Sequence, residues 1–216
     1  MLSVRARSLA LAGLLSLGLP AIAVEFDAQP CTLEDASSAL SGQSLLEAAQ
    51  QGLAGAQYQL ALSLDQGDQD FPQDAEKAAY WYQQAANQGH ACAQYNLAVG
   101  YEQGLGLVPD AELAVLWYRR AANQGDRDAQ FNLALAYEEG AGVEANPTQA
   151  LHWFHQAADG GDAEAQFQLG HYHALGRATA ADPQQARAWY AKAAAQQHQG
   201  AVQTLKKLEQ SAADVH

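Results

Sequence analysis

The sequence predicts an all-α protein, built as an α/α solenoid of tandem 36-residue helix-turn-helix repeats. Tryptophan recurs at a constant interval, at Trp81, Trp117, Trp153 and Trp189. An Ala-Gln pair precedes each tryptophan, at Ala56-Gln57, Ala93-Gln94, Ala129-Gln130 and Ala165-Gln166. A fixed period in the thirties is typical of stacked helix pairs. It places the repeats at about 53–89, 90–125, 126–161 and 162–197.

The first 23 residues have the pattern of a secretory signal peptide. Arg5 and Arg7 precede an apolar stretch at residues 9–19, and residues 21–23 form a small-x-small cleavage site. The alternative is a membrane anchor, but the apolar stretch is shorter than the roughly 20 residues that span a bilayer. We therefore expect cleavage after Ala23 and a periplasmic or secreted protein with no membrane span.

The chain is strongly acidic. Its formal charge is −13, and removal of Arg5 and Arg7 with the signal peptide gives −13 − 2 = −15. Such a surface repels phosphate backbones and anionic membranes. Nucleic acid is therefore not expected as a partner.

Residues 24–44 form an N-terminal segment that leads into a capping helix. This segment contains Cys31, and the only other cysteine is Cys92. An even number of cysteines in an exported protein favours a disulfide, and we expect Cys92 on an exposed helix face. A Cys31–Cys92 bond would attach the N-terminal segment to the second repeat. Two unpaired thiols are the alternative.

The first helix of each repeat is illustrated by residues 91–103. Ala93, Leu97, Ala98 and Tyr101 have the spacing of a buried helical stripe. The first helices are expected to end at left-handed glycines, Gly67, Gly104, Gly140 and Gly176. One extra residue in repeat one falls in the turn at residues 66–72, where an insertion does not disturb a helix face.

The second helix of each repeat is expected to begin after an Asp or Asn that caps it: Asp74, Asp110, Asn146 and Asp182. In repeat two its apolar face comprises Ala114, Trp117, Tyr118, Ala121 and Ala122. We expect all four tryptophans to be buried between the small residues. Glycine closes three of these helices, at Gly89, Gly125 and Gly161, but Gln197 occupies that position in repeat four.

The ends of the solenoid are expected to be capping helices, at residues 45–52 and 198–210. The solenoid then covers residues 45–208, and residues 211–216 are expected to be a disordered tail.

The repeat pattern A-x-A-Q-Y/F-x-L-A/G-x-x-Y-x-x-G-x-G-V, followed by D-x-x-x-A-x-x-W-Y/F-x-x-A-A-x-x-G, resembles the Sel1-like repeat, a relative of the tetratricopeptide repeat. Residues 91–125 and 128–161 match it almost throughout. Repeat four departs at His173, at Gly176-Arg177-Ala178 and at Gln197, so a looser outer turn is expected there. The resemblance implies a right-handed α/α superhelix that serves as an adaptor for protein complexes. Similar bacterial members are often exported and act in the cell envelope.

The resemblance also implies that the first helices line a concave binding face. Three columns of residues share the side of these helices away from the buried stripe. The aromatic column is Tyr58, Tyr95, Phe131 and Phe167; the amide column is Gln59, Asn96, Asn132 and Gln168; the third column is Leu62, Val99, Leu135 and His171. These residue types suit an extended peptide or a partner helix. The alternative is that the aromatics form the edge of the core and the amides are only solvated.

No catalytic residue, cofactor site or metal site is predicted. Ser63 occupies a packing position, and the His152–His155 pair lies in columns whose residue types vary between repeats, as is usual for solvated surface. The leading hypothesis is therefore an adaptor for a protein or peptide partner in the cell envelope. The alternatives are binding of a cell-wall glycan and a β-lactam-binding or hydrolysing enzyme of the cysteine-rich Sel1 type. Those enzymes carry a cysteine pair in each repeat, whereas this chain has two cysteines in all.

Overall fold

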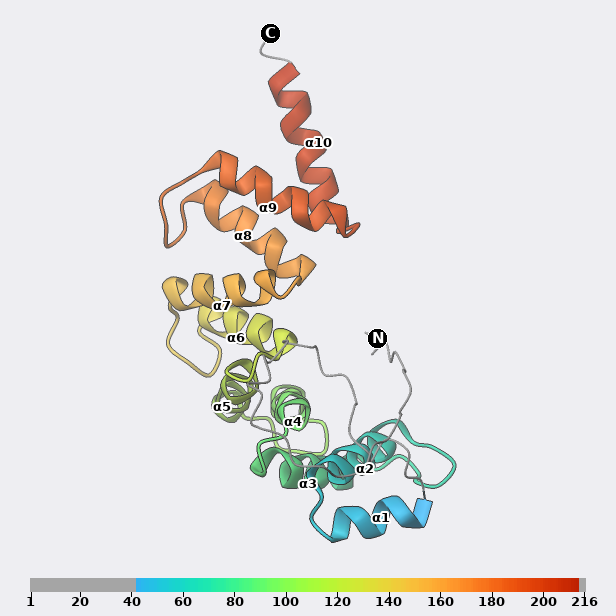
Figure 1. Cartoon of the computed structure of the whole chain (residues 1–216). Helices are drawn as coiled ribbons and strands as arrows, with labels where there is room; N and C mark the ends of the chain where they lie inside the picture. Colours follow the sequence, from blue (N-terminus) through green and yellow to red (C-terminus); the bar gives the residue numbers. More distant parts are fainter. Residues whose placement is uncertain (1–41, 214–216) are drawn as a thin grey trace, which may run out of the picture.

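The computed structural model describes residues 42–213, which form ten α-helices and no strand (Figure 1). The helices are α1 (Gly42–Gln50), α2 (Ala54–Gln66), α3 (Ala75–Asn87), α4 (Ala91–Gln103), α5 (Ala111–Ala122), α6 (Arg127–Glu139), α7 (Pro147–Asp159), α8 (Ala163–Leu175), α9 (Pro183–Ala195) and α10 (Gln199–Ala213). The expected signal peptide and Cys31 lie outside the described residues. None of the ten helices is long and apolar enough to cross a membrane.

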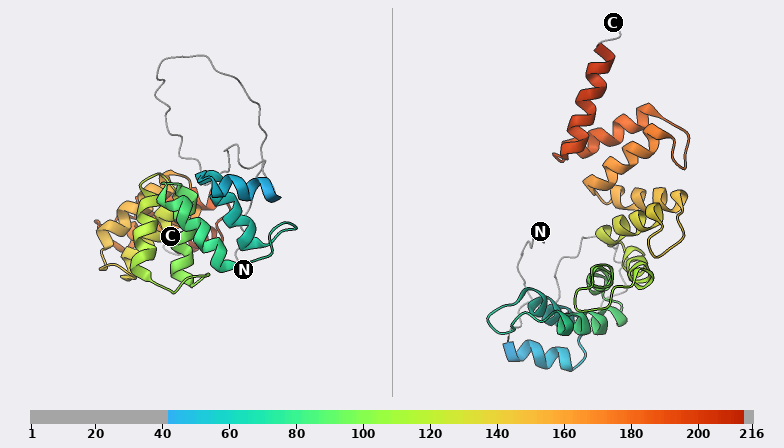
Figure 2. Two further views of the ribbon diagram at one scale, coloured as in Figure 1. Left: turned by 90° about the horizontal axis from the view of Figure 1, so that it is seen from below. Right: turned by 180° about the vertical axis from the view of Figure 1, so that it is seen from behind.

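The helices form a solenoid of four hairpins, α2–α3, α4–α5, α6–α7 and α8–α9, with α1 and α10 at opposite ends (Figures 1 and 2). We call the first helix of each hairpin the A helix and the second the B helix. The extensive contacts join helices that are consecutive in the chain. Each B helix thus packs on its own A helix and on the helix that follows it, which is the A helix of the next repeat or, after α9, the terminal helix α10.

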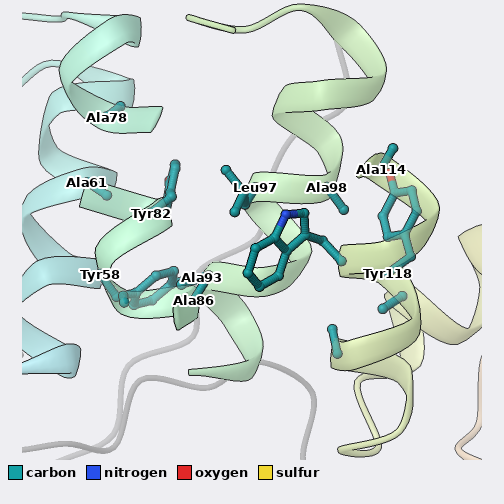
Figure 3. Close-up of a cluster of buried hydrophobic side chains, with 14 of the residues drawn as sticks. Tyr58, Ala61, Ala78, Tyr82, Ala86, Ala93, Leu97, Ala98, Ala114 and Tyr118 are labelled. Carbon is teal, nitrogen blue, oxygen red and sulfur yellow. The ribbon is translucent and has the colours of Figure 1, made fainter. Parts of the chain in front are cut away.

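The core is a seam of alanine, leucine and aromatic side chains that continues from hairpin to hairpin. Leu60, Leu97, Leu133 and Leu169 occupy the same position of the four A helices and are almost completely buried. Figure 3 shows Tyr82, Leu97 and Tyr118, which come from the successive helices α3, α4 and α5. Buried alanines such as Ala93 and Ala121 let the helices approach closely.

The four tryptophans are not equally buried, contrary to the prediction. Trp117 and Trp189 are 5% and 8% exposed, whereas Trp81 and Trp153 are half-buried. Cations cover the two buried rings: the Arg120 guanidinium lies 4.3 Å from the centroid of Trp117, and the Lys192 ammonium 3.6 Å from that of Trp189. Repeats one and three have Gln84 and Gln156 at the position of these cations, so their indoles lack this cover.

Two expected helix ends need correction. Gly67 has φ 73° and ψ 128°, outside the left-handed helical region that Gly104, Gly140 and Gly176 adopt, because the turn after α2 is one residue longer. Helix α10 extends to Ala213, so residues 211–213 are helical and do not belong to a tail. The Ser211 hydroxyl donates to the Lys207 carbonyl within this last turn, and alanine follows, which has the highest helix propensity.

Replacing Gln197 with glycine should stabilise the protein. At this closing position Gly89, Gly125 and Gly161 have φ near +90°, and Gln197 is forced to φ +65°. An L-residue in this region costs roughly 1–2 kcal/mol, so Gln197→Gly should raise the free energy of unfolding by about 1 kcal/mol. Urea unfolding monitored by circular dichroism measures the change. Gln203→Gly, an exposed position inside α10, is the matched control and should lower stability by about 1 kcal/mol. A loss of stability in both variants would contradict the inference that the backbone at Gln197 is strained.

Candidate functional site

The candidate site is the side of the A helices that carries the three predicted columns. Eleven of the twelve residues are half-buried, and Tyr58 is buried at 5% exposure. One column of the B helices is instead exposed in all four repeats: Tyr80, Leu116, His152 and Ala188. The A helices therefore present a sheltered face and the B helices an outer one.

The aromatic column belongs to the edge of the core, as the alternative interpretation held. Each ring packs on a ring of the B helix in its own repeat. The centroid distances are 6.0 Å for Tyr58–Tyr82, 5.9 Å for Tyr95–Tyr118, 5.8 Å for Phe131–Phe154 and 5.7 Å for Phe167–Tyr190. At the two ends of the solenoid an imidazole covers the ring as well, His90 on Tyr58 and His198 on Phe167. We therefore base the proposed binding surface on the other two columns, and partner binding by these four aromatics stays a prediction.

The amide column lies across the junctions between repeats. Asn96 lies beside the hydroxyl of Tyr58, and Asn132 beside those of Tyr95 and Tyr118. Burial raises the pKa of Tyr58 to about 12 and that of Tyr95 to about 12, and the neighbouring amides partly oppose this by favouring the ionised hydroxyls. Each asparagine therefore helps to hold its repeat against the preceding one.

The two glutamines of the amide column differ from each other. Gln168 donates to the Glu164 carboxylate at 3.3 Å. The Gln59 Nε2 atom is buried and has no hydrogen-bond partner among the described residues. A buried unsatisfied donor costs free energy, so this amide is a local destabilising feature of the first repeat.

The third column changes character along the solenoid. Leu62, Val99 and Leu135 are half-buried aliphatic side chains that pack against the core. His171 replaces them in repeat four, where its Nδ1 lies 3.2 Å from the Tyr190 hydroxyl, and burial lowers the pKa of its imidazole. The third column is therefore apolar in the first three repeats and polar in the fourth.

A column of carboxylates borders this face and was not singled out in the sequence. Asp65, Glu102 and Glu138 occupy the twelfth position of α2, α4 and α6, three residues after the third column. Asp65 lines a hollow of about 50 Å³ together with Asn96 and Val99 of the predicted columns. Asp65 is therefore continuous with the candidate surface, and Glu102 and Glu138 occupy the equivalent positions of the next two A helices.

The recurring glutamines Gln57, Gln94, Gln130 and Gln166 have a structural role that spacing alone did not reveal. Their side-chain amides donate to the carbonyls of Ala49, Ala86, Ala122 and Ala158 at 3.1–3.2 Å. Those carbonyls belong to the last turn of the preceding helix, and each also accepts from the backbone N–H of a closing glycine: Gly52, Gly89, Gly125 or Gly161. Three of these glutamines also accept from a second glutamine, Gln88, Gln124 or Gln196. The sequence did contain a signal of this role, because a polar residue recurs in every repeat beside a buried alanine.

The other candidate residues have structural surroundings. Ser63 hydrogen-bonds Asp68 and lowers the pKa of its carboxyl. His155 lies against His173, with ring centroids 6.2 Å apart, and burial lowers the pKa of His155. Among residues 42–211, no three His, Cys, Asp or Glu side chains are grouped to hold a metal ion.

Cys92 does not lie on an exposed helix face as expected. It is half-buried and packs against the core. Its expected partner, Cys31, lies outside the described residues, so the Cys31–Cys92 disulfide stays a prediction.

Comparison with known proteins identifies the repeat. The sequence profile of the Sel1 repeat matches residues 54–90, 93–126, 127–162 and 163–198, more than half of the chain. A protective antigen of uropathogenic Escherichia coli strains with an SLR fold is 36% identical, covers 73% of this chain and 33% of its own, and superposes with a TM-score of 0.70. A Sel1 repeat protein from Oxalobacter formigenes is 34% identical, covers 76% of this chain and 64% of its own, and has a TM-score of 0.67. This chain thus spans less than two thirds of either relative. No curated protein matches it.

Proposed function

Since this chain belongs to the Sel1 repeat family, we propose that it is a non-catalytic adaptor that holds an extended segment of a protein partner along its A helices. The fold is a scaffold typical of protein–protein interaction. Repeat solenoids present long continuous surfaces to their partners. A partner segment that lies across the four A helices would contact one set of side chains per repeat.

One observation carries this proposal. The amide and third columns are half-buried on four consecutive A helices, and together they form what we call the helix-A strip: Gln59, Leu62, Asn96, Val99, Asn132, Leu135, Gln168 and His171. Amides hydrogen-bond the peptide backbone, and the aliphatic side chains between them contact apolar groups. Seven of these eight side chains are amides or aliphatic groups, which do not transfer protons, and the eighth, His171, lies 3.2 Å from the Tyr190 hydroxyl. The composition of the strip therefore favours binding over chemistry.

The proposed partner is a protein of the cell envelope. The support is the signal-peptide pattern of residues 1–23, with which we propose export to the periplasm or beyond. A glycan partner is not proposed, because the rings that would stack on sugars pack instead on α3, α5, α7 and α9.

Site-specific photo-cross-linking in intact cells tests the proposed surface. We expect benzoylphenylalanine at Val99 or Leu135 to give a discrete adduct with one envelope protein. The matched controls carry the same group on the outer face, at Tyr80 or Leu116, which are 54% and 37% exposed. These positions are at least as accessible to a random collision, so they report non-specific contact. Adducts from the outer positions only, or from neither set, would contradict the proposal.

A further inference from the structure

The carboxylates of the column that borders the helix-A strip have different partners in successive repeats. In repeat three Glu138 forms an ion pair with Arg177, whose guanidinium also lies 5.1 Å from the ring centroid of Tyr172. Arg177 directly follows Gly176, the glycine that caps α8. The outer turn of one repeat thus supplies a cation to the carboxylate of the preceding repeat.

The corresponding turns of the earlier repeats supply no cation. Leu105 follows the capping glycine of α4, and Ala141 follows that of α6. Within residues 42–211, neither Asp65 nor Glu102 forms an ion pair. Glu102 accepts a hydrogen bond of 2.9 Å from Tyr118, which leaves its charge uncompensated. Two carboxylates of the column therefore lack the guanidinium that the third one has.

Asp65 also lies in a shaped hollow. The hollow lies between α2, α3 and α4, its walls include Ala78, Leu105 and Val99, and Asn96 adds an amide. Burial raises the pKa of the Asp65 carboxyl, and no positive group opposes that effect. An apolar wall that ends at a carboxylate fits the alkyl stem and charged end of a lysine or arginine side chain.

We propose that the segment held by the helix-A strip is basic, with one lysine or arginine side chain in the hollow at Asp65 and a second at Glu102. The ion pair between Glu138 and Arg177 is the internal precedent for this contact. The net charge of −13 favours the same partner, because complementary charge speeds association and selects against acidic competitors. This inference rests on the proposed function, since it specifies the partner of the same strip.

Selection of peptides tests the inference. A phage-displayed library of random 12-residue peptides is panned against four forms of the chain. They are the wild type, the double variant Asp65→Asn/Glu102→Gln, the charge-matched control Glu112→Gln/Glu144→Gln, and the strip variant Leu135→Lys. Glu112 and Glu144 are exposed, at the start of α5 and in an outer turn. Circular dichroism verifies that each variant keeps its helices.

We expect lysine and arginine to be enriched in peptides selected by the wild type and by the control, and not in those selected by Asp65→Asn/Glu102→Gln. A selected peptide, synthesised with a fluorescent label, should bind the double variant at least about tenfold more weakly, because each carboxylate contributes to a charge-assisted contact. Its affinity for the control should be unchanged.

Other outcomes separate this inference from the function that it specifies. Peptides without basic enrichment, whose binding is lost in Leu135→Lys but kept in Asp65→Asn/Glu102→Gln, would overturn the inference and leave the proposed function intact. If the wild type selects no peptide above the level of Leu135→Lys, both are overturned. Equal weakening by the double variant and by the charge-matched control would also overturn the inference, because it would show a diffuse charge effect.

Discussion

Replacing Trp117 with alanine should lower the free energy of unfolding by about 3–5 kcal/mol, the usual cost of removing a buried aromatic. Trp117 is 5% exposed, and the Arg120 guanidinium covers one face of its indole. Its removal leaves a cavity between α5 and its neighbours in the middle of the array. Trp81, the equivalent residue of repeat one, is half-buried, so Trp81→Ala should cost only about 1–2 kcal/mol of transfer free energy.

Urea unfolding followed by circular dichroism and by the fluorescence of the remaining tryptophans measures both losses. The extensive contacts of each helix are with its neighbours in the chain, and stability in such arrays is a sum of repeat and interface contributions. Trp117→Ala weakens the middle of the solenoid, so we expect the unfolding transition of this variant to broaden or split into two steps. We expect no such change for Trp81→Ala. Equal losses in the two variants would show that burial does not set the contribution of these tryptophans.

The helix boundaries were predictable because their signals are local. Asp74, Asp110, Asn146 and Asp182 each cap a B helix through their own side chain, within three residues of the cap. A single sequence contains all the chemistry of such a contact. The period of 36 residues then fixed the order of the hairpins. The caps that precede α4 and α10 were harder to find, because they are imidazoles, His90 and His198.

The depth of burial was not predictable, because it depends on residues about one repeat away. Tyr58 is buried and Trp81 is not, although both looked like members of regular columns. The cover of Tyr58 includes His90, 32 residues further along the chain. A helical pattern shows which positions share a face, but not how closely the next helix approaches it.

The same limit applies to the candidate site. The columns of the helix-A strip follow from the repeat, so their common face could be placed from sequence. Asp65, Glu102 and Glu138 looked like ordinary polar residues at the ends of helices. Only the ion pair between Glu138 and Arg177, 39 residues apart, shows that this column can hold a cation.

Gly142→Ala should be among the most damaging of the conservative substitutions in this chain. Gly142 has φ +68°, and a Cβ atom there would lie 2.1 Å from the carbonyl oxygen of Ala111 and 2.8 Å from the backbone nitrogen of Glu112. Those atoms belong to the first turn of α5 and cannot rotate away. The outer turn of repeat three would have to leave α5, and we expect the free energy of unfolding to fall by roughly 3 kcal/mol from overpacking and backbone strain together.

Gly161→Ala separates the two contributions. Gly161 has φ +89°, but a Cβ atom there would meet nothing within 4 Å, so this variant incurs the backbone strain alone, about 1–2 kcal/mol. Repeat four has Ala178 at the position of Gly142, with φ +55°, so its turn cannot approach α7 as closely as the turn of repeat three approaches α5. Ala178→Gly should therefore raise stability where Gly142→Ala lowers it. Equal losses in Gly142→Ala and Gly161→Ala would mean that the turn detaches from α5 at no cost. The outer turns would then be loose connections, and the position of Arg177 over Glu138 could no longer be attributed to a fixed turn.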